Sequence, residues 1–314
     1  SGGPRAVKYG VTKDWVYGLE VVLPSGGIIN TGGKLLKNVS GYNMTQLFVG
    51  SEGTLGIITK ATLKLIAKPK FSAVILAAYA DAHTACRTVP ALFMKGLLPS
   101  ACEFMEREAM EMAVGHLDKK LPNSDAPAQL LIELDGNDET RLREEIEIAG
   151  EICDSGGARE VIIADTGAKC AEIWEIRRAV GEAIKSHSVY KEEDTVVPRA
   201  RLADLFTGMK EICEMRGVKS VCYGHAGDGN LHVNLLKDTL TDDEWRERLP
   251  GTIDEIFRLC VSLGGTISGE HGIGWSQKTY LEIAVGDTEI ELMRSLKRTL
   301  DPNVILNPGK IFDM

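Results

Sequence analysis

Two histidines stand seven residues apart in the stretch Gly224-His225-Ala226-Gly227-Asp228-Gly229-Asn230-Leu231-His232. On a helix, this spacing would separate their Cα atoms by about 10 Å along the axis, which is too far for one metal ion. The glycines, aspartate and asparagine between them are instead typical of a turn. We therefore predict a turn that leads into a strand over residues 231–235 and brings the two imidazoles together.

A second stretch whose residues could take part in catalysis is Gly269-Glu270-His271-Gly272. A carboxylate oxygen from Glu270 would complete a donor set of two histidines and one carboxylate, which leaves a coordination position open for catalysis. His271, beside it, would remain available for proton transfer. Histidines in glycine-rich loops are often turn residues or satisfied surface groups, so spacing alone leaves a metal site and a structural role equally open.

The first block of the chain, residues 1–68, has the composition of strands joined by tight, glycine-rich turns. We expect strands over residues 15–23, 28–29 and 57–66, and a short helix at 45–48. Glycines at this density let a backbone approach a large flat or phosphorylated ligand closely. Ordinary hairpin turns explain the same composition.

The middle of the chain alternates between strand and helix patterns. We predict strands at 71–79, 100–104, 129–134 and 158–164, and helices at 81–94, 106–117 and 138–152. In the last helix, Leu142, Ile146 and Ala149 share one face. This order predicts an α+β fold with a ferredoxin-like antiparallel sheet and flanking helices.

The remaining elements surround the histidine stretch. The expected helices span 168–186, 202–215, 242–263 and 288–300, and strands are expected near 195–197 and at 219–223. The first of these helices carries Trp174 and Arg177, and the charged run 190–194 lies between it and the strand expected near 195–197.

Composition limits the classes of protein. The chain has 314 residues, 44% of them hydrophobic, which suits two domains with sizeable cores. Its net charge of -9 argues against nucleic acid as a partner. Seven scattered cysteines without a Cys-x-x-Cys pair favour a reducing cytoplasm, and no stretch is apolar enough to span a membrane. Without an initiator Met, Ser1 is expected to be a cut end.

Five motifs occur in a fixed order: Asn38-Val39-Ser40-Gly41-Tyr42, Gly50-Ser51-Glu52-Gly53-Thr54-Leu55-Gly56, the histidine stretch 224–232, Gly269-Glu270-His271-Gly272 and Asn307-Pro308-Gly309-Lys310. In these motifs the chain resembles the FAD-linked D-2-hydroxyacid dehydrogenases, which include glycolate oxidase FAD subunits, D-lactate dehydrogenases and D-2-hydroxyglutarate dehydrogenases. That family belongs to the vanillyl-alcohol oxidase flavoprotein superfamily.

The resemblance also implies a domain plan. Family members have an earlier half of the FAD domain, which holds the pyrophosphate and which this sequence lacks. Residues 1–68 would then be the second half of the FAD domain, 69–285 the substrate-binding cap, and 286–314 a segment that returns to the flavin. The missing N-terminal half would be a required partner.

Residue roles follow from the same resemblance. The flavin-side positions are Gly10, Asn38, Gly41, Tyr42, Ser51, Glu52, Gly53, Gly56, Ile58 and Asn307. The ligands of a divalent metal, zinc or manganese, would be His225, His232 and Glu270. His271 would be the catalytic base, and Arg177 and Lys191 would bind the substrate carboxylate.

The implied reaction oxidises a D-2-hydroxy acid to the 2-oxo acid, with proton removal by His271 and hydride transfer to FAD. The electron acceptor would be an iron–sulfur subunit, an electron-transferring flavoprotein or a quinone, which could also hold the protein at a membrane. The sequence specifies neither the hydroxy acid nor the oligomeric state, for which a homodimer is one candidate. Alternatives are a non-redox flavoenzyme of the alkyl-glycerone-phosphate synthase type and a non-catalytic subunit.

Overall fold

The computed structural model describes residues 2–314, which divide into two compact units. The first unit contains Gly2, Gly10–Ala67 and Glu270–Met314, and the second contains Gly3–Tyr9 and Lys68–Gly269. The boundaries predicted from the sequence lie at 68 and 285, and the assignment of a flavin domain and a cap stays a prediction. Among the described residues, no helix combines the length and the apolar character that crossing a membrane requires.

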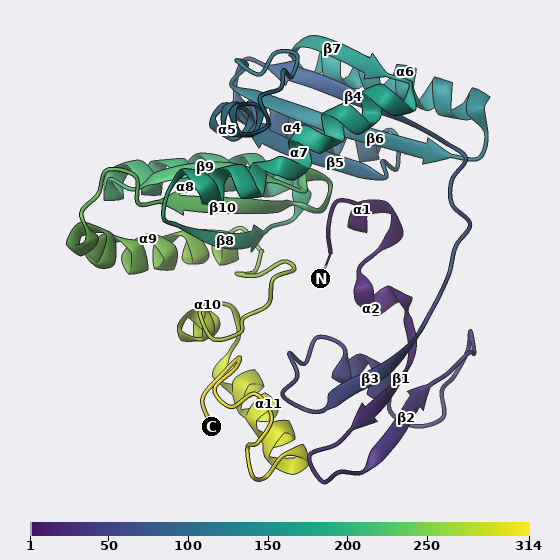
Figure 1. The fold of residues 1–314 in the computed structure, drawn as a ribbon, viewed down its shortest axis with the longest axis vertical. Coiled ribbons are helices and arrows are strands. Elements are labelled where there is room, and N and C mark those ends of the chain that lie inside the picture. Colours follow the sequence, from purple (N-terminus) through teal and green to yellow (C-terminus); the bar gives the residue numbers. More distant parts are fainter. Residues whose placement is uncertain (1) are drawn as a thin grey trace. The chain divides into compact units, whose positions relative to one another are not determined.

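The first unit is built on a three-stranded antiparallel sheet in the order β2-β1-β3 (Figure 1). Its elements are α2 (Thr12–Trp15), β1 (Val16–Val22), β2 (Ile28–Gly32), α3 (Met44–Phe48), β3 (Ile57–Leu63), η3 (Lys278–Tyr280), α10 (Leu281–Ala284) and α11 (Asp287–Leu300). Its core joins Val21 of β1 to Phe48 of α3. At Gly56 an added Cβ would lie 2.5 Å from Val21 Cγ1, so only glycine lets this loop pack so closely.

A buried lysine ties the two distant segments of the first unit together. The Lys297 ammonium of α11 donates to the backbone oxygens of Thr54 and Leu306, each at 2.7 Å, and to the Asp301 carboxylate. Burying an ammonium is costly unless it is paired and hydrogen-bonded, and these three partners meet that condition. The loop after α3 and the C-terminal loop are thereby held against one another.

The second unit contains a seven-stranded antiparallel sheet in the order β7-β4-β6-β5-β9-β10-β8. Its strands are β4 (Phe71–Tyr79), β5 (Ala101–Glu106), β6 (Ala128–Gly136), β7 (Ala158–Ala164), β8 (Tyr190–Val196), β9 (Lys219–Gly224) and β10 (Asn230–Leu236). The first four strands have the order of a ferredoxin-like sheet, which confirms the predicted α+β class.

Two layers of helices cover this sheet (Figure 1). One layer contains α4 (Ala82–Met94), α6 (Glu139–Ser155), α8 (Leu202–Arg216) and α9 (Asp242–Ser262), and the other contains α5 (Arg107–Leu117) and α7 (Gly167–His187). Helix α1 (Ala6–Tyr9) and the 3-10 turns η1 (Arg199–Arg201) and η2 (Ala226–Asp228) complete the unit. The core under α5 and α7 includes Met105, Met110, Trp174 and Ile176.

Strand β8 is longer than predicted. It begins at Tyr190 and includes the charged run 190–194, whereas the strand was expected only near 195–197. Four successive charged residues are not typical of a buried strand. Glu193 and Asp194 are nevertheless fully buried, and they pair with Val233 and His232 of β10.

Candidate active site

The turn between β9 and β10 brings the two histidines together, as predicted. His225 directly follows β9, and its backbone oxygen accepts hydrogen bonds from the backbone nitrogens of Asp228 and Asn230. Gly229 has a φ of +75°, and a Cβ there would lie 2.0 Å from the Val197 backbone oxygen. The turn therefore requires glycine, and it places the ring centroids of His225 and His232 5.3 Å apart.

The spacing of the two rings fits a shared cation. A ring nitrogen binds zinc at about 2.0–2.1 Å, so the ion lies about 3.2 Å from the ring centre. Two rings that share one ion can therefore have centres up to about 6.4 Å apart, and those of His225 and His232 meet this condition. Both side chains are buried in the second unit, where a bound cation would be well shielded from water.

A buried carboxylate supports His225. Both carboxylate oxygens of Glu103, on β5, lie 2.9 Å from His225 Nδ1. Arg177 Nη2, on α7, donates to Glu103 Oε2 at 2.5 Å. Burial pushes the pKa of Glu103 upward, but the charges of Arg177 and His225 outweigh it and hold that pKa below its ordinary value. Glu103 is thus an ionised acceptor between two donors.

The surroundings of His232 are also acidic. Its Nδ1 lies 3.5 Å from Glu192 Oε1 and 3.9 Å from Asp194 Oδ1, both on the neighbouring strand β8. Asp194 is held by Asn230 Nδ2 at 2.7 Å and by the Ser268 hydroxyl at 3.1 Å. The carboxylate of Asp194 is therefore fixed in orientation before any ligand binds.

Helix α7 is joined to the sheet by two of its side chains, which bond to carboxylates on neighbouring strands. Trp174 Nε1 donates to Glu133 Oε2 on β6 at 2.6 Å, and Arg177, one turn later, reaches Glu103 on β5. The guanidinium also lies over the ring of Tyr223, 4.7 Å from its centroid. Among the described residues, Arg177 Nε has no hydrogen-bond partner although it is buried.

Lys191 lies on β8 beside the acidic residues. Its ammonium is 3.3 Å from Glu193 Oε1 and donates to the Glu192 backbone oxygen at 3.4 Å. Because side chains alternate along a strand, Lys191 and Glu193 project from the face opposite to Glu192 and Asp194. The predicted contacts of Arg177 and Lys191 with a substrate carboxylate stay predictions.

Glu270 and His271 belong to the first unit, directly after the last residue of the second. The Gly2 backbone nitrogen donates to Glu270 Oε2 at 2.9 Å. The segment that follows is held by Glu52, whose carboxylate accepts hydrogen bonds from the backbone nitrogens of Ile273 at 2.8 Å and Gly274 at 2.7 Å. Glu52 therefore restrains the loop that carries His271, which sequence reasoning did not anticipate.

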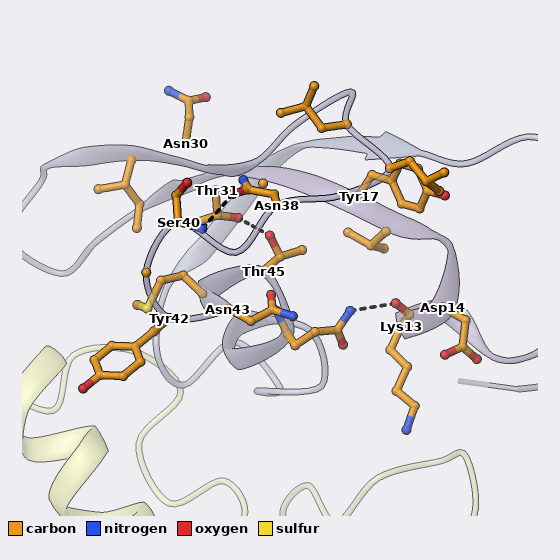
Figure 2. A pocket seen from close by; sticks show the side chains of 18 residues that line it. Lys13, Asp14, Tyr17, Asn30, Thr31, Asn38, Ser40, Tyr42, Asn43 and Thr45 are labelled. Atoms are coloured by element: carbon orange, nitrogen blue, oxygen red, sulfur yellow. Dashed lines mark hydrogen bonds between the residues drawn. The ribbon is translucent and has the colours of Figure 1, made fainter.

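The predicted flavin-side residues line two cavities of the first unit. Asn38, Gly41 and Tyr42 line a cavity of about 580 Å³ next to β1, β2 and α3. In Figure 2, Asn38 folds back to accept a hydrogen bond from the Ser40 backbone nitrogen, whereas Tyr42 points outward. A second cavity, of about 450 Å³, is lined by Ser51, Glu52, Gly53, Gly56, Ile58 and Asn307.

Some of these residues already have partners within the protein. Ser51 donates to the Phe48 backbone oxygen at 2.8 Å, and Asn307 Nδ2 donates to the Glu52 backbone oxygen at 2.6 Å. Gly10, which lines neither cavity, has a φ of +80°. Contacts of these residues with a flavin stay predictions.

Comparison with known proteins identifies the family. Residues 68–311 match the family described as FAD linked oxidases, C-terminal domain, which is more than half of the chain. The chain belongs to the FAD-linked oxidases. Solved structures agree on the fold: p-cresol methylhydroxylase with substrate bound superimposes with a TM-score of 0.76 at 16% identity, covering 99% of this chain and 68% of that one.

Curated relatives of this FAD-linked oxidase are named as oxidoreductases. A D-lactate dehydrogenase of Anaerostipes hadrus is 40% identical over 99% of the chain and 67% of its own length. The glycolate oxidase subunit GlcD of Bacillus subtilis is 42% identical over 99% of the chain and 66% of its own length. A D-2-hydroxyglutarate dehydrogenase of Stutzerimonas stutzeri is 31% identical over 99% and 68%. The chain thus spans about two thirds of the length of these relatives.

Proposed function

We propose that the protein oxidises a D-2-hydroxy acid of the glycolate or D-lactate type to the 2-oxo acid, with FAD as the cofactor. The names of the relatives support this reaction class. The observation that carries the proposal is the buried pair His225 and His232, with ring centroids 5.3 Å apart and Glu103 against the Nδ1 atom of His225. Such a pair suits a cation that binds a small oxygen ligand.

In this proposal, His225, His232 and Glu270 bind one divalent cation, zinc or manganese. The course of the chain supports the third ligand. The Gly269 backbone nitrogen donates to the Asp194 backbone oxygen at 2.9 Å, and Asp194 pairs directly with His232 across the sheet. Glu270 is the next residue, so its Cα lies within about 3.8 Å of that of Gly269.

Each residue has a distinct task in the reaction. Arg177 binds the substrate carboxylate, and His271 takes the hydroxyl proton on its imidazole. The expected contact of Lys191 with this carboxylate is not part of the proposal, because Lys191 projects from the face of β8 opposite to Asp194, the residue paired with His232. A histidine suits this step because its ordinary pKa lies near neutrality. When bound, FAD supplies the redox chemistry and the cation supplies a Lewis acid at the substrate hydroxyl.

The proposal includes two further partners. One is the upstream segment that the relatives contain, which would complete the flavin site. The other is an electron acceptor, namely an iron–sulfur subunit, an electron-transferring flavoprotein or a quinone. The acceptor is needed to complete the redox cycle, because a flavin reduced by substrate must pass its electrons on.

Two substitutions test this function in a protein that carries the complete flavin site. His271→Asn should keep the metal and the flavin but slow flavin reduction by a D-2-hydroxy acid by about 100-fold or more, the usual effect of losing a general base. His225→Asn should lose the metal as well. Elemental analysis and stopped-flow flavin absorbance measure the two effects. Wild-type rates in His271→Asn, or full activity in metal-free protein, would contradict the proposal.

A further inference from the structure

Glu103 is a charged residue in the middle of a buried strand. Its side chain is fully buried on β5, and its neighbours in the sequence are Cys102 and Phe104, also buried. A carboxylate in such a place needs compensating donors, because leaving it unpaired costs several kcal/mol. Two donors are present, Arg177 from α7 and His225 from the turn after β9.

These contacts restrict where the proton of His225 can lie. Glu103 Oε2 already accepts a hydrogen bond from the Arg177 guanidinium, which can only donate. The ionised Glu103 carboxylate can only accept a hydrogen bond from Nδ1 of His225, so a neutral His225 carries its proton on Nδ1. The lone pair of that imidazole then lies on Nε2, the nitrogen with which the ring can bind a cation.

We propose that Glu103 is a positioning residue that fixes the Nδ1–H tautomer of His225 and thereby presents Nε2 to a divalent cation. The inference rests on the proposed function, since it assigns Glu103 a role at the same metal site. A carboxylate on the far nitrogen orients the ring, fixes the tautomer and makes the metal-binding nitrogen more basic. Nothing in the motifs pointed to Glu103, because β5 lies more than a hundred residues before the histidines.

A purely structural role for Glu103, as the partner of Arg177 alone, is the competing explanation. Glu133 on β6 shows what such a role looks like, because it is a buried carboxylate that binds Trp174 and Arg5. Glu103 differs in that both of its oxygens lie 2.9 Å from one histidine nitrogen. The two explanations therefore predict different behaviour of the His225 ring when Glu103 is changed.

Glu103→Gln is the informative variant, and Glu106→Gln is its matched control. Glutamine has one acceptor oxygen, and its NH2 group can only donate, so it cannot accept from Arg177. When that oxygen turns to Arg177, the amide donates toward His225 and favours the opposite tautomer. Glu106 is on the same strand, is also buried, and pairs with Lys210 at 2.7 Å and with the Cys222 backbone nitrogen at 2.6 Å.

The measurements are Zn²⁺ affinity, by competition with a chelating dye, and the His225 tautomer. Long-range proton–nitrogen NMR of the 314-residue chain with labelled histidines reports the tautomer in mildly alkaline solution. The chain has six histidines, and loss of a signal in His225→Asn identifies the one needed. We expect Glu103→Gln to weaken Zn²⁺ binding by about 10–100-fold and to shift His225 toward Nε2–H. Glu106→Gln should change neither property, even where it lowers the melting temperature.

A double variant keeps the test decisive if Glu103→Gln folds poorly. Glu103→Leu with Arg177→Met removes both charges, and replacing a buried ion pair by apolar residues is often tolerated. It should fold and still show the altered tautomer and the weaker Zn²⁺ binding. An Nε2–H tautomer in the wild type, or wild-type affinity and tautomer in a folded variant, overturns the inference. Absence of Zn²⁺ binding by the wild type overturns the metal site itself, while the NMR result continues to judge the positioning role.

Discussion

The buried acidic residues of the second unit differ in their ionisation. Glu103 is ionised because Arg177 and His225 surround it. At Glu193, burial outweighs the charge of the Lys191 ammonium at 3.3 Å and raises the pKa to about 7. The same residue type is thus held ionised on β5 and close to half-protonated at neutral pH on β8.

Glu193 makes the stability of the fold dependent on pH. Its pKa is about 7 when folded, against about 4.3 for an unfolded glutamate. The folded protein therefore binds more protons between these values, and stability falls as the pH rises from about 4.3 toward 7. The loss is about 1.4 kcal/mol per pKa unit. We expect Glu193→Gln to remove this pH dependence and to be more stable than the wild type at pH 8, as measured by urea unfolding.

A surface carboxylate provides the control for this prediction. Glu247→Gln, at an exposed position of α9, should follow the wild-type curve at every pH. If Glu193→Gln loses stability equally at pH 5.5 and pH 8, the Glu193 carboxylate is ionised throughout this range and its pKa is not raised.

At the scale of single residues, the sequence could predict the histidine pair but not its supporting acids. Two histidines in a glycine-rich turn are visible as a local pattern, and Gly229 explains why the turn closes. Glu103 and Asp194 contact them only through strand pairing and packing. The one local signal for Glu103 is its place in the middle of the otherwise apolar run 101–105, which predicts a buried partner without naming it.

At the scale of elements, long amphipathic helices and apolar strands were predicted closely, and β8 was not. Helix α7, expected at 168–186, spans Gly167–His187. β8 carries a run of charges that neighbouring strands help to stabilise, since Glu192 accepts a hydrogen bond from the Tyr223 hydroxyl of β9 and Asp194 accepts one from Asn230 Nδ2 of β10. Tertiary contacts of this kind override local propensity and cannot be read from the strand itself.

The loop that carries His271 depends on a contact between elements. The Glu52 carboxylate accepts hydrogen bonds from the backbone nitrogens of Ile273 and Gly274. Gly272 approaches this carboxylate so closely that an added Cβ would lie 2.7 Å from Oε1. Glu52→Gln leaves one acceptor oxygen and turns an amide toward the other donor. We expect hydrogen exchange at Ile273 and Gly274 to accelerate by about 10-fold, equivalent to roughly 1.4 kcal/mol, the range for one lost charge-assisted hydrogen bond.

Glu20→Gln is the matched control for this loop. Glu20 belongs to the same unit, but its carboxylate bonds to the Lys60 and Thr59 side chains rather than to the loop. Its substitution should leave exchange at residues 273–274 unchanged. Equal protection in Glu52→Gln and the wild type would show that other contacts hold the His271 loop.

At the scale of the whole molecule, the first unit exposes several large apolar side chains. Leu36 is 83% exposed, Val39 is 96% exposed and Tyr42 is 94% exposed, all in the loop between β2 and α3. Ile57 and Leu63 of β3 are also exposed. Large exposed apolar areas on a folded protein indicate a binding surface. The relatives, of which this chain spans about two thirds, contain a further segment that could cover it.

This surface leads to a prediction about the cofactor. The 314-residue chain alone should bind FAD weakly, because part of the flavin-binding surface is proposed to lie in the upstream segment of the relatives. Adding that segment, fused or as a separate fragment, should give a yellow protein with stoichiometric flavin, measured by absorbance and calorimetry.

Leu36→Ser with Val39→Ser should weaken binding of the separate fragment, because it removes apolar area from the docking surface. The Zn²⁺ affinity of the same variant serves as the control and should stay unchanged, since neither residue belongs to the histidine site. Tight stoichiometric FAD on the 314-residue chain alone would show that the flavin site is complete without the upstream segment.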